Sequence, residues 1–207
     1  MSEAGKQFWN KMAERYAARP IKDVAAYEAM LADAAGRLSP TDRVLEIGCG
    51  TGGTAIRLGA GVARWDATDL SPEMVRIARA KPAPAQVSFE VGDALEASNR
   101  GGYDVVCAFL ILHLVDDLDA ALAAIYRQLA PSGLLISKTY CLKDMNAVMR
   151  RVALPALRTL GWLPPITMLG VADLRSAITQ AGFAIEDAKT FGTNRHAHYI
   201  VARKIAH

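Results

Sequence analysis

Acidic residues around a glycine-rich stretch are the part of this sequence best suited to bind a charged ligand. Glu46 stands two residues before the first glycine of Gly48-Cys49-Gly50-Thr51-Gly52, and Asp69 follows 23 residues after Glu46. Glycine adopts backbone angles closed to other residues and leaves no side chain between the main chain and a ligand. A buried carboxylate is costly unless a partner compensates it. The pattern predicts a ligand that brings positive charge or hydroxyl groups to bare backbone.

Two kinds of nucleotide ligand suit this glycine-rich turn. The spacing Gly48-x-Gly50-x-x-Gly53 also matches the pattern of dinucleotide-binding dehydrogenases. A pyrophosphate, however, prefers helix N–H groups with no anion nearby, so Glu46 argues against it. S-adenosylmethionine has a sulfonium cation, an amino group and ribose hydroxyls and no phosphate. The acidic strand end therefore favours S-adenosylmethionine, with nicotinamide-dependent oxidoreduction as a rival.

Five stretches together resemble the motifs of the class I S-adenosylmethionine-dependent methyltransferases. They are residues 45–52 (the glycine-rich motif I), 69–74 (the end of the second strand), 92–94 (the adenine-contacting turn), 103–106 (the fourth strand) and 129–135 (the turn before the fifth strand). The resemblance is firm over residues 5–140 and departs from the family at Ser132, where glycine is usual. A turn is expected to tolerate this serine.

The resemblance implies a cofactor, S-adenosylmethionine, which leaves as S-adenosylhomocysteine. Asp69 would accept the ribose hydroxyls, the role given to an acid about 20 residues beyond a nucleotide-binding turn. Asp93 would meet the adenine amino group and the Ala94 N–H would meet the ring. The expected cofactor-binding residues are Tyr16, Glu46, Gly48, Cys49, Gly50, Gly52, Asp69, Leu70, Met74, Asp93, Ala94, Ala108 and Phe109.

Plainer interpretations stand beside three of these roles. Ser71 before Pro72 makes a good helix N-cap, which would leave Asp69 free for the ribose. Asp93 could be a solvated turn residue, and Met74 could fill the core as methionine often does.

The chemistry that the resemblance implies is a one-step displacement of a methyl group from sulfur. The protein mainly has to align acceptor, methyl carbon and sulfur, and to exclude water. An oxygen or protonated nitrogen acceptor would also need a base, and the candidates are His113, Tyr16 and Tyr140. His113 could instead order a loop by hydrogen bonding. A neutral amine or a thiolate would need no base, so the acceptor stays open.

The elements that position these residues alternate between strands and helices. Strands are predicted at 44–47, 63–69, 87–91, 103–110, 134–139, 183–190 and 196–203. Helices are predicted at 4–19, 22–37, 53–59, 72–80, 116–129 and 171–181. With the resemblance, this order implies an α/β fold: a Rossmann-like, doubly wound, seven-stranded sheet, mostly parallel with an antiparallel last strand and helices on both faces. Such sheets bind ligands at the carboxyl ends of strands, where strand order reverses.

Two segments are expected to flank the site within one domain of residues 1–207. Residues 1–20 would form either a helix packed by its apolar stripe or a lid over the cofactor that carries Tyr16. Residues 144–169 are apolar and basic, with Arg151 and Arg158 seven apart on one helix face. This insertion would roof a pocket for a small, apolar or lipid-like acceptor, or else meet lipid headgroups. A peripheral lipid-binding or non-catalytic protein with this fold is therefore the alternative function.

Composition limits the remaining possibilities. The 207 residues suit one domain, and a net charge of +3 without a lysine or arginine block predicts no nucleic-acid partner. The three cysteines have no paired metal spacing, and His196 and His198 share a strand face without a third ligand in view, so no metal is expected. No secretion signal or spanning run is visible, which predicts a cytoplasmic protein. The oligomeric state stays open.

Overall fold

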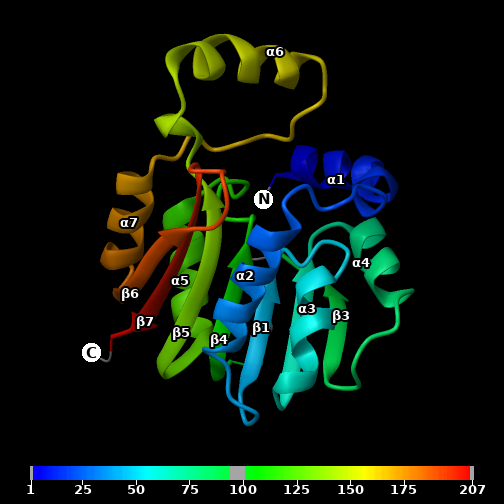
Figure 1. Ribbon diagram of the computed structural model, residues 1–207, viewed down its shortest axis with the longest axis vertical. Helices are drawn as coiled ribbons and strands as arrows, with labels where there is room; N and C mark the ends of the chain where they lie inside the picture. The colour runs from blue at the N-terminus through cyan, green and yellow to red at the C-terminus, as the bar shows by residue number, and fades with distance from the viewer. Residues whose placement is uncertain (1, 94–100, 206–207) are drawn as a thin grey trace.

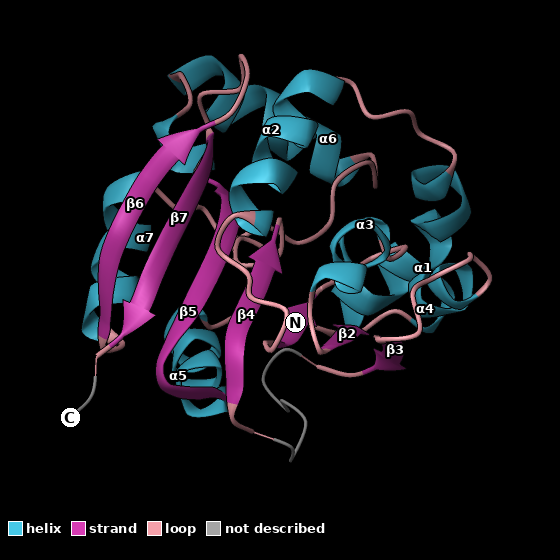
Figure 2. Cartoon of the chain, turned by 60° about the horizontal axis from the view of Figure 1, so that its bottom comes forward, coloured by secondary structure: helices cyan, strands magenta, loops and turns pink. Residues whose placement is uncertain are grey.

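The computed structural model describes residues 2–93 and 101–205 (Figure 1). Its strands form one seven-stranded sheet in the order β3-β2-β1-β4-β5-β7-β6. Their bounds are β1 Arg43–Ile47, β2 Arg64–Asp69, β3 Val87–Val91, β4 Tyr103–Phe109, β5 Leu129–Tyr140, β6 Phe183–Thr190 and β7 Ala197–Lys204. Strands β1 to β5 pair in parallel, and β7 is antiparallel to both β5 and β6. The predicted doubly wound sheet with an antiparallel last strand is confirmed, and Figure 2 shows β7 between β5 and β6.

Helices cover both faces of this sheet. They are α1 Glu3–Ala17, α2 Val24–Ala35, α3 Gly53–Leu58, α4 Pro72–Arg79, α5 Leu118–Gln128, α6 Leu154–Thr159 and α7 Val171–Gln180. One buried cluster joins the sheet to α5 and α7, for example through Ile125 and Ile178. A second cluster joins the other face to α2, α3 and α4, for example through Met30 and Val75. The helices therefore sit as a doubly wound fold requires.

The central strands are apolar at nearly every position because both of their faces are covered. In β4, Val106 packs into the α5–α7 cluster while its neighbour Val105 packs into the opposite cluster. Successive side chains of a strand point to opposite faces, so this run has no polar side to present. Strand order reverses between β1 and β4, which lie side by side and lead to β2 and β5 respectively. Their carboxyl ends meet at the switch point, where such folds bind ligands.

Strand β5 differs from the predicted strand at 134–139. It begins at Leu129, and its pairing with β4 shifts register between Tyr103 and Val105. Within this irregular stretch Ser132 has φ of 61°, in the left-handed region. A residue with a Cβ loses about 1–2 kcal/mol there, whereas glycine does not. The turn does accommodate serine as expected, but with backbone strain that explains why glycine suits the position.

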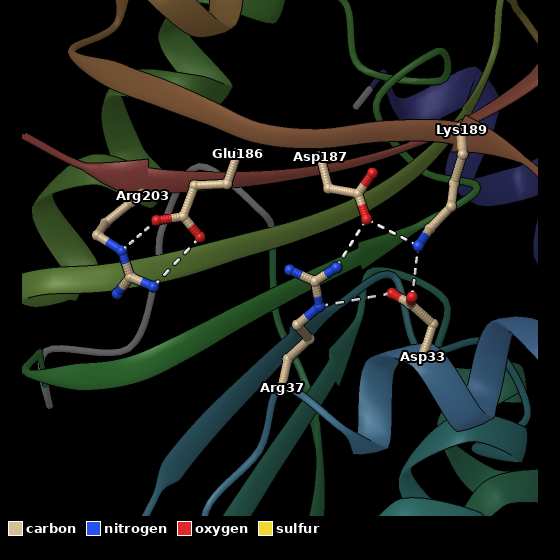
Figure 3. Close-up of polar contacts among 6 residues, drawn as sticks. All are labelled: Asp33, Arg37, Glu186, Asp187, Lys189 and Arg203. Atoms are coloured by element: carbon tan, nitrogen blue, oxygen red, sulfur yellow. Dashed lines mark hydrogen bonds and ion pairs between the residues drawn. The ribbon is translucent and has the colours of Figure 1, made fainter.

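Ion pairs fasten α2 to the far edge of the sheet (Figure 3). Asp33 of α2 lies 2.5 Å from the Lys189 ammonium group, and Arg37 lies 2.7 Å from Asp187. Single exposed pairs of this kind contribute about 0–1 kcal/mol, so the network mainly fixes how α2 lies against β6. In the described part of the chain, no helix is long and apolar enough to cross a membrane.

Candidate active site

The glycine-rich turn links β1 to α3 in a form that only glycine allows. Gly48 and Gly52 have φ of 68° and 79°. A Cβ on Gly48 would lie 2.7 Å from Ile111, and one on Gly52 would lie 2.8 Å from the Phe89 ring. The turn is also held from outside, because the Lys81 ammonium group donates to the Thr51 carbonyl at 2.7 Å. Sequence reasoning missed Lys81, which lies beyond α4 and has no fixed spacing to the turn.

Glu46 lies one residue before the end of β1, as the sequence suggested, and it is buried. Its side chain is 2% exposed and accepts a hydrogen bond from the Trp65 indole N–H at 3.1 Å. Burial, and secondarily the charge of Asp69, raises the pKa of the Glu46 carboxyl to about 8. Glu46 therefore carries a proton much of the time at neutral pH. Its direct contact with the cofactor stays a prediction.

Asp69 ties the end of β2 to the glycine-rich turn. One carboxylate oxygen accepts from the Gly50 N–H at 2.8 Å and the other from the Ser71 N–H at 2.9 Å. Burial raises the pKa of Asp69 against the lowering effect of these two hydrogen bonds. Ser71 caps α4 as expected, accepting from the Met74 N–H at 3.2 Å, but Asp69 is not free beside it. Each carboxylate oxygen has a further lone pair that a ribose hydroxyl could use.

Helix α1 packs across α4 and not over open solvent. Ala13 is buried with Met74 and Ile77, so Met74 takes the packing role. The Ser71 hydroxyl donates to Asn10 at 2.5 Å, and Arg76 pairs with Glu14. These contacts stabilise α1 in its position against α4. Opening and closing of α1 as a lid stays a prediction.

Tyr16 reaches from the last turn of α1 to the glycine-rich turn. A Cβ on Gly50 would lie 3.9 Å from the Tyr16 ring. The whole side chain is 44% exposed, yet burial around its hydroxyl, with Tyr140 and further anionic neighbours including Asp69, raises its pKa. The exposed fraction describes the whole ring, whereas the pKa reports the surroundings of the oxygen. At neutral pH the Tyr16 hydroxyl is therefore protonated and can donate a hydrogen bond.

His113, which lies beyond the end of β4, meets Tyr140, the last residue of β5. Their rings contact edge to face with centroids 5.2 Å apart. His113 is 6% exposed, and burial lowers the pKa of its imidazole to about 4. Its Nδ1 atom has no hydrogen-bond partner among the described residues. Leu110, just past β4, has φ of 56°, the kind of backbone strain that clusters at functional sites.

The other expected cofactor residues lie around the same sheet edge. Cys49 is buried in the turn, and burial raises the pKa of its thiol well above the usual range, so it is a packed thiol and not a reactive one. Ala108 is fully buried, whereas Leu70, Asp93 and Phe109 are half-buried. Ala94 lies outside the described residues. The structure thus joins Asp69 to the turn by a hydrogen bond and places the Tyr16 ring beside Gly50.

A cavity of about 470 Å³ lies within the predicted insertion, next to the end of β5. Apolar side chains such as Leu154, Leu163 and Ile166 line it, together with three basic residues: Lys143, Arg150 and Arg158. No residue of the glycine-rich turn lines it, so the cavity is beside the cofactor region and not over it. The roofing role of residues 144–169 stays a prediction that this cavity favours.

One group of possible metal ligands comes together that the sequence did not suggest. Atoms of Cys141, Asp144 and His198 lie within 4.8 Å of one another. Antiparallel pairing of β5 with β7 brings them together, since Thr139 lies opposite His198. However, burial raises the pKa of Cys141 to about 12, and Asp144 already accepts from the Val171 N–H at 2.7 Å. Cys141 is therefore a neutral thiol, and the Asp144 carboxylate beside it already has a hydrogen-bond donor.

Known proteins are similar to this chain in sequence. Residues 44–133 match a family described as a methyltransferase domain. The biotin biosynthesis bifunctional protein BioCD of Bordetella avium is 33% identical over 171 residues, which cover 80% of this chain and 36% of that protein. The ubiquinone biosynthesis O-methyltransferase of Methylobacterium nodulans is 32% identical over 158 residues, which cover 70% of this chain and 60% of that protein. The chain thus spans less than two thirds of these relatives.

Solved structures repeat the fold over the whole chain. The N-methyltransferase NodS of Bradyrhizobium japonicum, solved with S-adenosylhomocysteine, superposes with a TM-score of 0.73, covering 98% of this chain and 99% of NodS at 16% identity. At that identity the likeness shows the fold alone. The chain thus carries a methyltransferase domain in residues 44–133, on the fold that it shares with S-adenosylmethionine-dependent methyltransferases.

Proposed function

We propose that this protein transfers a methyl group from S-adenosylmethionine to a small acceptor by direct displacement. The observation that carries the proposal is the hydrogen bond from the Gly50 N–H to Asp69, at a bare backbone that the Tyr16 ring approaches. This contact lies at the edge where β1 and β4 diverge, the place for a nucleoside in such a sheet. Asp69 would hold the ribose hydroxyls, and the NodS complex with S-adenosylhomocysteine supports this site by analogy of fold.

The reaction requires little from this chain beyond the alignment of the acceptor with the methyl carbon and the sulfur. The acceptor's lone pair forms the new bond to carbon as the carbon–sulfur bond breaks, and sulfur leaves as a neutral thioether. The raised pKa of Tyr16 keeps its hydroxyl protonated, which suits a positioning hydrogen bond better than proton abstraction. The lowered pKa of His113, about 4, makes it a weak base at neutral pH. These environments favour an acceptor that arrives already deprotonated.

The relatives leave the acceptor atom open, since M. nodulans supplies an O-methyltransferase and B. japonicum an N-methyltransferase. Calorimetry with S-adenosylhomocysteine should show saturable binding, and the same protein should not bind NADH. Release of S-adenosylhomocysteine would then be followed with panels of carboxylic acids, amines and phenols. Binding of NADH in place of S-adenosylhomocysteine would overturn the proposal.

A lipid surface is a second candidate partner, through the outer face of the insertion. Val148, Val152, Leu160 and Trp162 are each more than 60% exposed there. The sequence has no aspartate or glutamate from residue 145 to 172 but has three arginines, a composition that suits anionic headgroups. In Figure 1 the insertion stands beyond the carboxyl edge of the sheet, at the top of the view.

Co-sedimentation with vesicles tests this lipid contact. The assay is done at low salt, because salt screens the attraction between exposed charges. Vesicles that contain anionic phosphatidylglycerol should then pull down the protein, and zwitterionic phosphatidylcholine vesicles should pull down less of it. Trp162→Ser, which removes the largest exposed apolar side chain of the segment, should reduce the bound fraction several-fold. Equal recovery with and without vesicles would remove the lipid candidate and leave methyl transfer untouched.

A further inference from the structure

The cavity in the insertion is a preformed site of the size that small ligands use. Its volume of about 470 Å³ falls within the roughly 300–1,000 Å³ of small-molecule pockets. Its walls come from one continuous segment, which begins at Leu142, shortly after the end of β5, and runs to Met168. The Thr167 N–H donates to the His113 carbonyl at 2.9 Å, and the Lys143 N–H donates to the Leu169 carbonyl at 3.0 Å. The walls are therefore fixed to the sheet edge that carries His113.

The arginines that line the cavity are not the pair that regular helical spacing selects. Residues 149–153 form a π-helical turn, in which the Leu154 N–H reaches the carbonyl of Met149, five residues back. Pro155 follows it and has no N–H to bond the carbonyl four residues earlier, which favours a widened turn. The widened turn holds about one extra residue. Two residues eight positions apart across it therefore lie on the same helix face, as residues seven positions apart do in a regular α-helix. Arg150 and Arg158 accordingly line the cavity, and Arg151 does not.

Charge in the cavity is unbalanced. None of the residues that line it is acidic, whereas three are basic. Lys143 is neutralised by Asp173 at 2.8 Å. Arg150 uses one N–H group on the Lys143 carbonyl at 2.8 Å, and the guanidinium group of Arg158 makes no ion pair or hydrogen bond to any described residue. Two guanidinium groups thus stand beside an apolar wall with most of their donors unused.

We infer that this cavity binds the methyl acceptor, and that the acceptor is an amphiphilic small molecule whose apolar part fills the cavity and whose carboxylate, or another oxyanion, meets Arg150 and Arg158. The inference rests on the proposed methyl transfer and names the substrate class of that site. A planar guanidinium matches a carboxylate in two-pronged geometry, while Leu154, Leu163 and Ile166 offer the apolar contact. An anionic acceptor also fits a site without a strong base.

Paired fluorescent probes test the inference without knowledge of the natural acceptor. The probes are 11-(dansylamino)undecanoate and its methyl ester, which share an apolar body and differ in the charge of one end. The wild-type protein should bind the acid about tenfold more tightly than the ester. Arg158→Gln should remove much of the preference for the acid, with Arg150 still in place, and leave the affinity for the ester unchanged. Arg151→Gln, an exposed neighbour outside the cavity, is the matched control and should change neither.

Each other outcome overturns the inference. Equal affinity for acid and ester would mean that no anionic group is recognised, and unsaturable binding of both probes would mean that the cavity is not a site. An equal loss with Arg151→Gln would reduce the effect to general surface attraction. Calorimetry with S-adenosylhomocysteine on the same proteins keeps the two proposals apart: intact cofactor binding with failed probes removes only the acceptor class, and lost cofactor binding in the wild type removes the methyl transfer.

Discussion

The Glu46→Gln variant is expected to be more stable than the wild type at pH 8 and to lose most of the pH dependence of stability between about pH 5 and 8. Burial raises the pKa of Glu46 in the folded protein to about 8, against an ordinary pKa of 4.5 for glutamate. Between these values the folded state holds a proton that the unfolded state releases. The stabilisation by the protonated form is complete below about pH 4.5 and is lost as pH rises towards 8.

The expected size of this effect follows from the shift. One pKa unit corresponds to about 1.4 kcal/mol, so a shift of this order contributes about 4 kcal/mol across the window. Glutamine cannot ionise, and its carbonyl oxygen can still accept from the Trp65 indole N–H. Asp69, whose pKa burial also raises, remains in the variant and leaves a residual slope of the same sign.

Urea unfolding at pH 5, 6.5 and 8 measures the effect. Glu28→Gln is the matched control, since Glu28 is exposed, its pKa is lowered by the hydrogen bonds from Arg57, and it should not change the slope. A wild-type protein of constant stability from pH 5 to 8 would contradict the buried-acid account. So would a Glu46→Gln variant that keeps the wild-type slope.

Local signals explain why most of the fold could be predicted. Helices α4 and α5 begin where Ser71 and Asp117 accept hydrogen bonds from backbone N–H groups three residues ahead, a pattern visible in the sequence. Strands β1 and β4 are mostly apolar, which is typical of strands covered on both faces. The strand order came with the family resemblance, because five motifs in the right sequence order constrain the sheet more than any propensity does.

Long-range pairing explains why part of the candidate site could not be predicted. The position of Glu46 is set by Trp65, on a neighbouring strand 19 residues later, and nothing in local spacing announces that hydrogen bond. The position of the Tyr16 ring beside Gly50 depends on how α1 docks on α4. Likewise, regular helical periodicity selects Arg151, whereas a single π-helical turn brings Arg150 to the cavity instead. One extra residue in a turn is enough to change which charge faces inward.

Asp69→Asn is expected to weaken S-adenosylhomocysteine binding by about 10–100-fold. The substitution keeps the size of the side chain but replaces one acceptor oxygen with an NH2 group. That NH2 group faces the N–H of Gly50 or of Ser71, and it cannot accept a hydrogen bond from a ribose hydroxyl as the carboxylate oxygen could. Leaving buried polar partners unmet costs about 1–3 kcal/mol, and 1.4 kcal/mol is tenfold in affinity.

Asp66→Asn is the matched control for this prediction. Asp66 lies on the same strand and is 2% exposed, but its carboxylate meets Arg64, Ser88 and Tyr103 and not the glycine-rich turn. Its loss should lower the melting temperature and leave the dissociation constant for S-adenosylhomocysteine within about threefold of the wild type, because distant sites act independently. Calorimetry and thermal unfolding of both variants separate ligand contact from stability. Equal affinity of Asp69→Asn and wild type would exclude Asp69 from the cofactor site, and an equal loss in Asp66→Asn would assign the effect to stability alone.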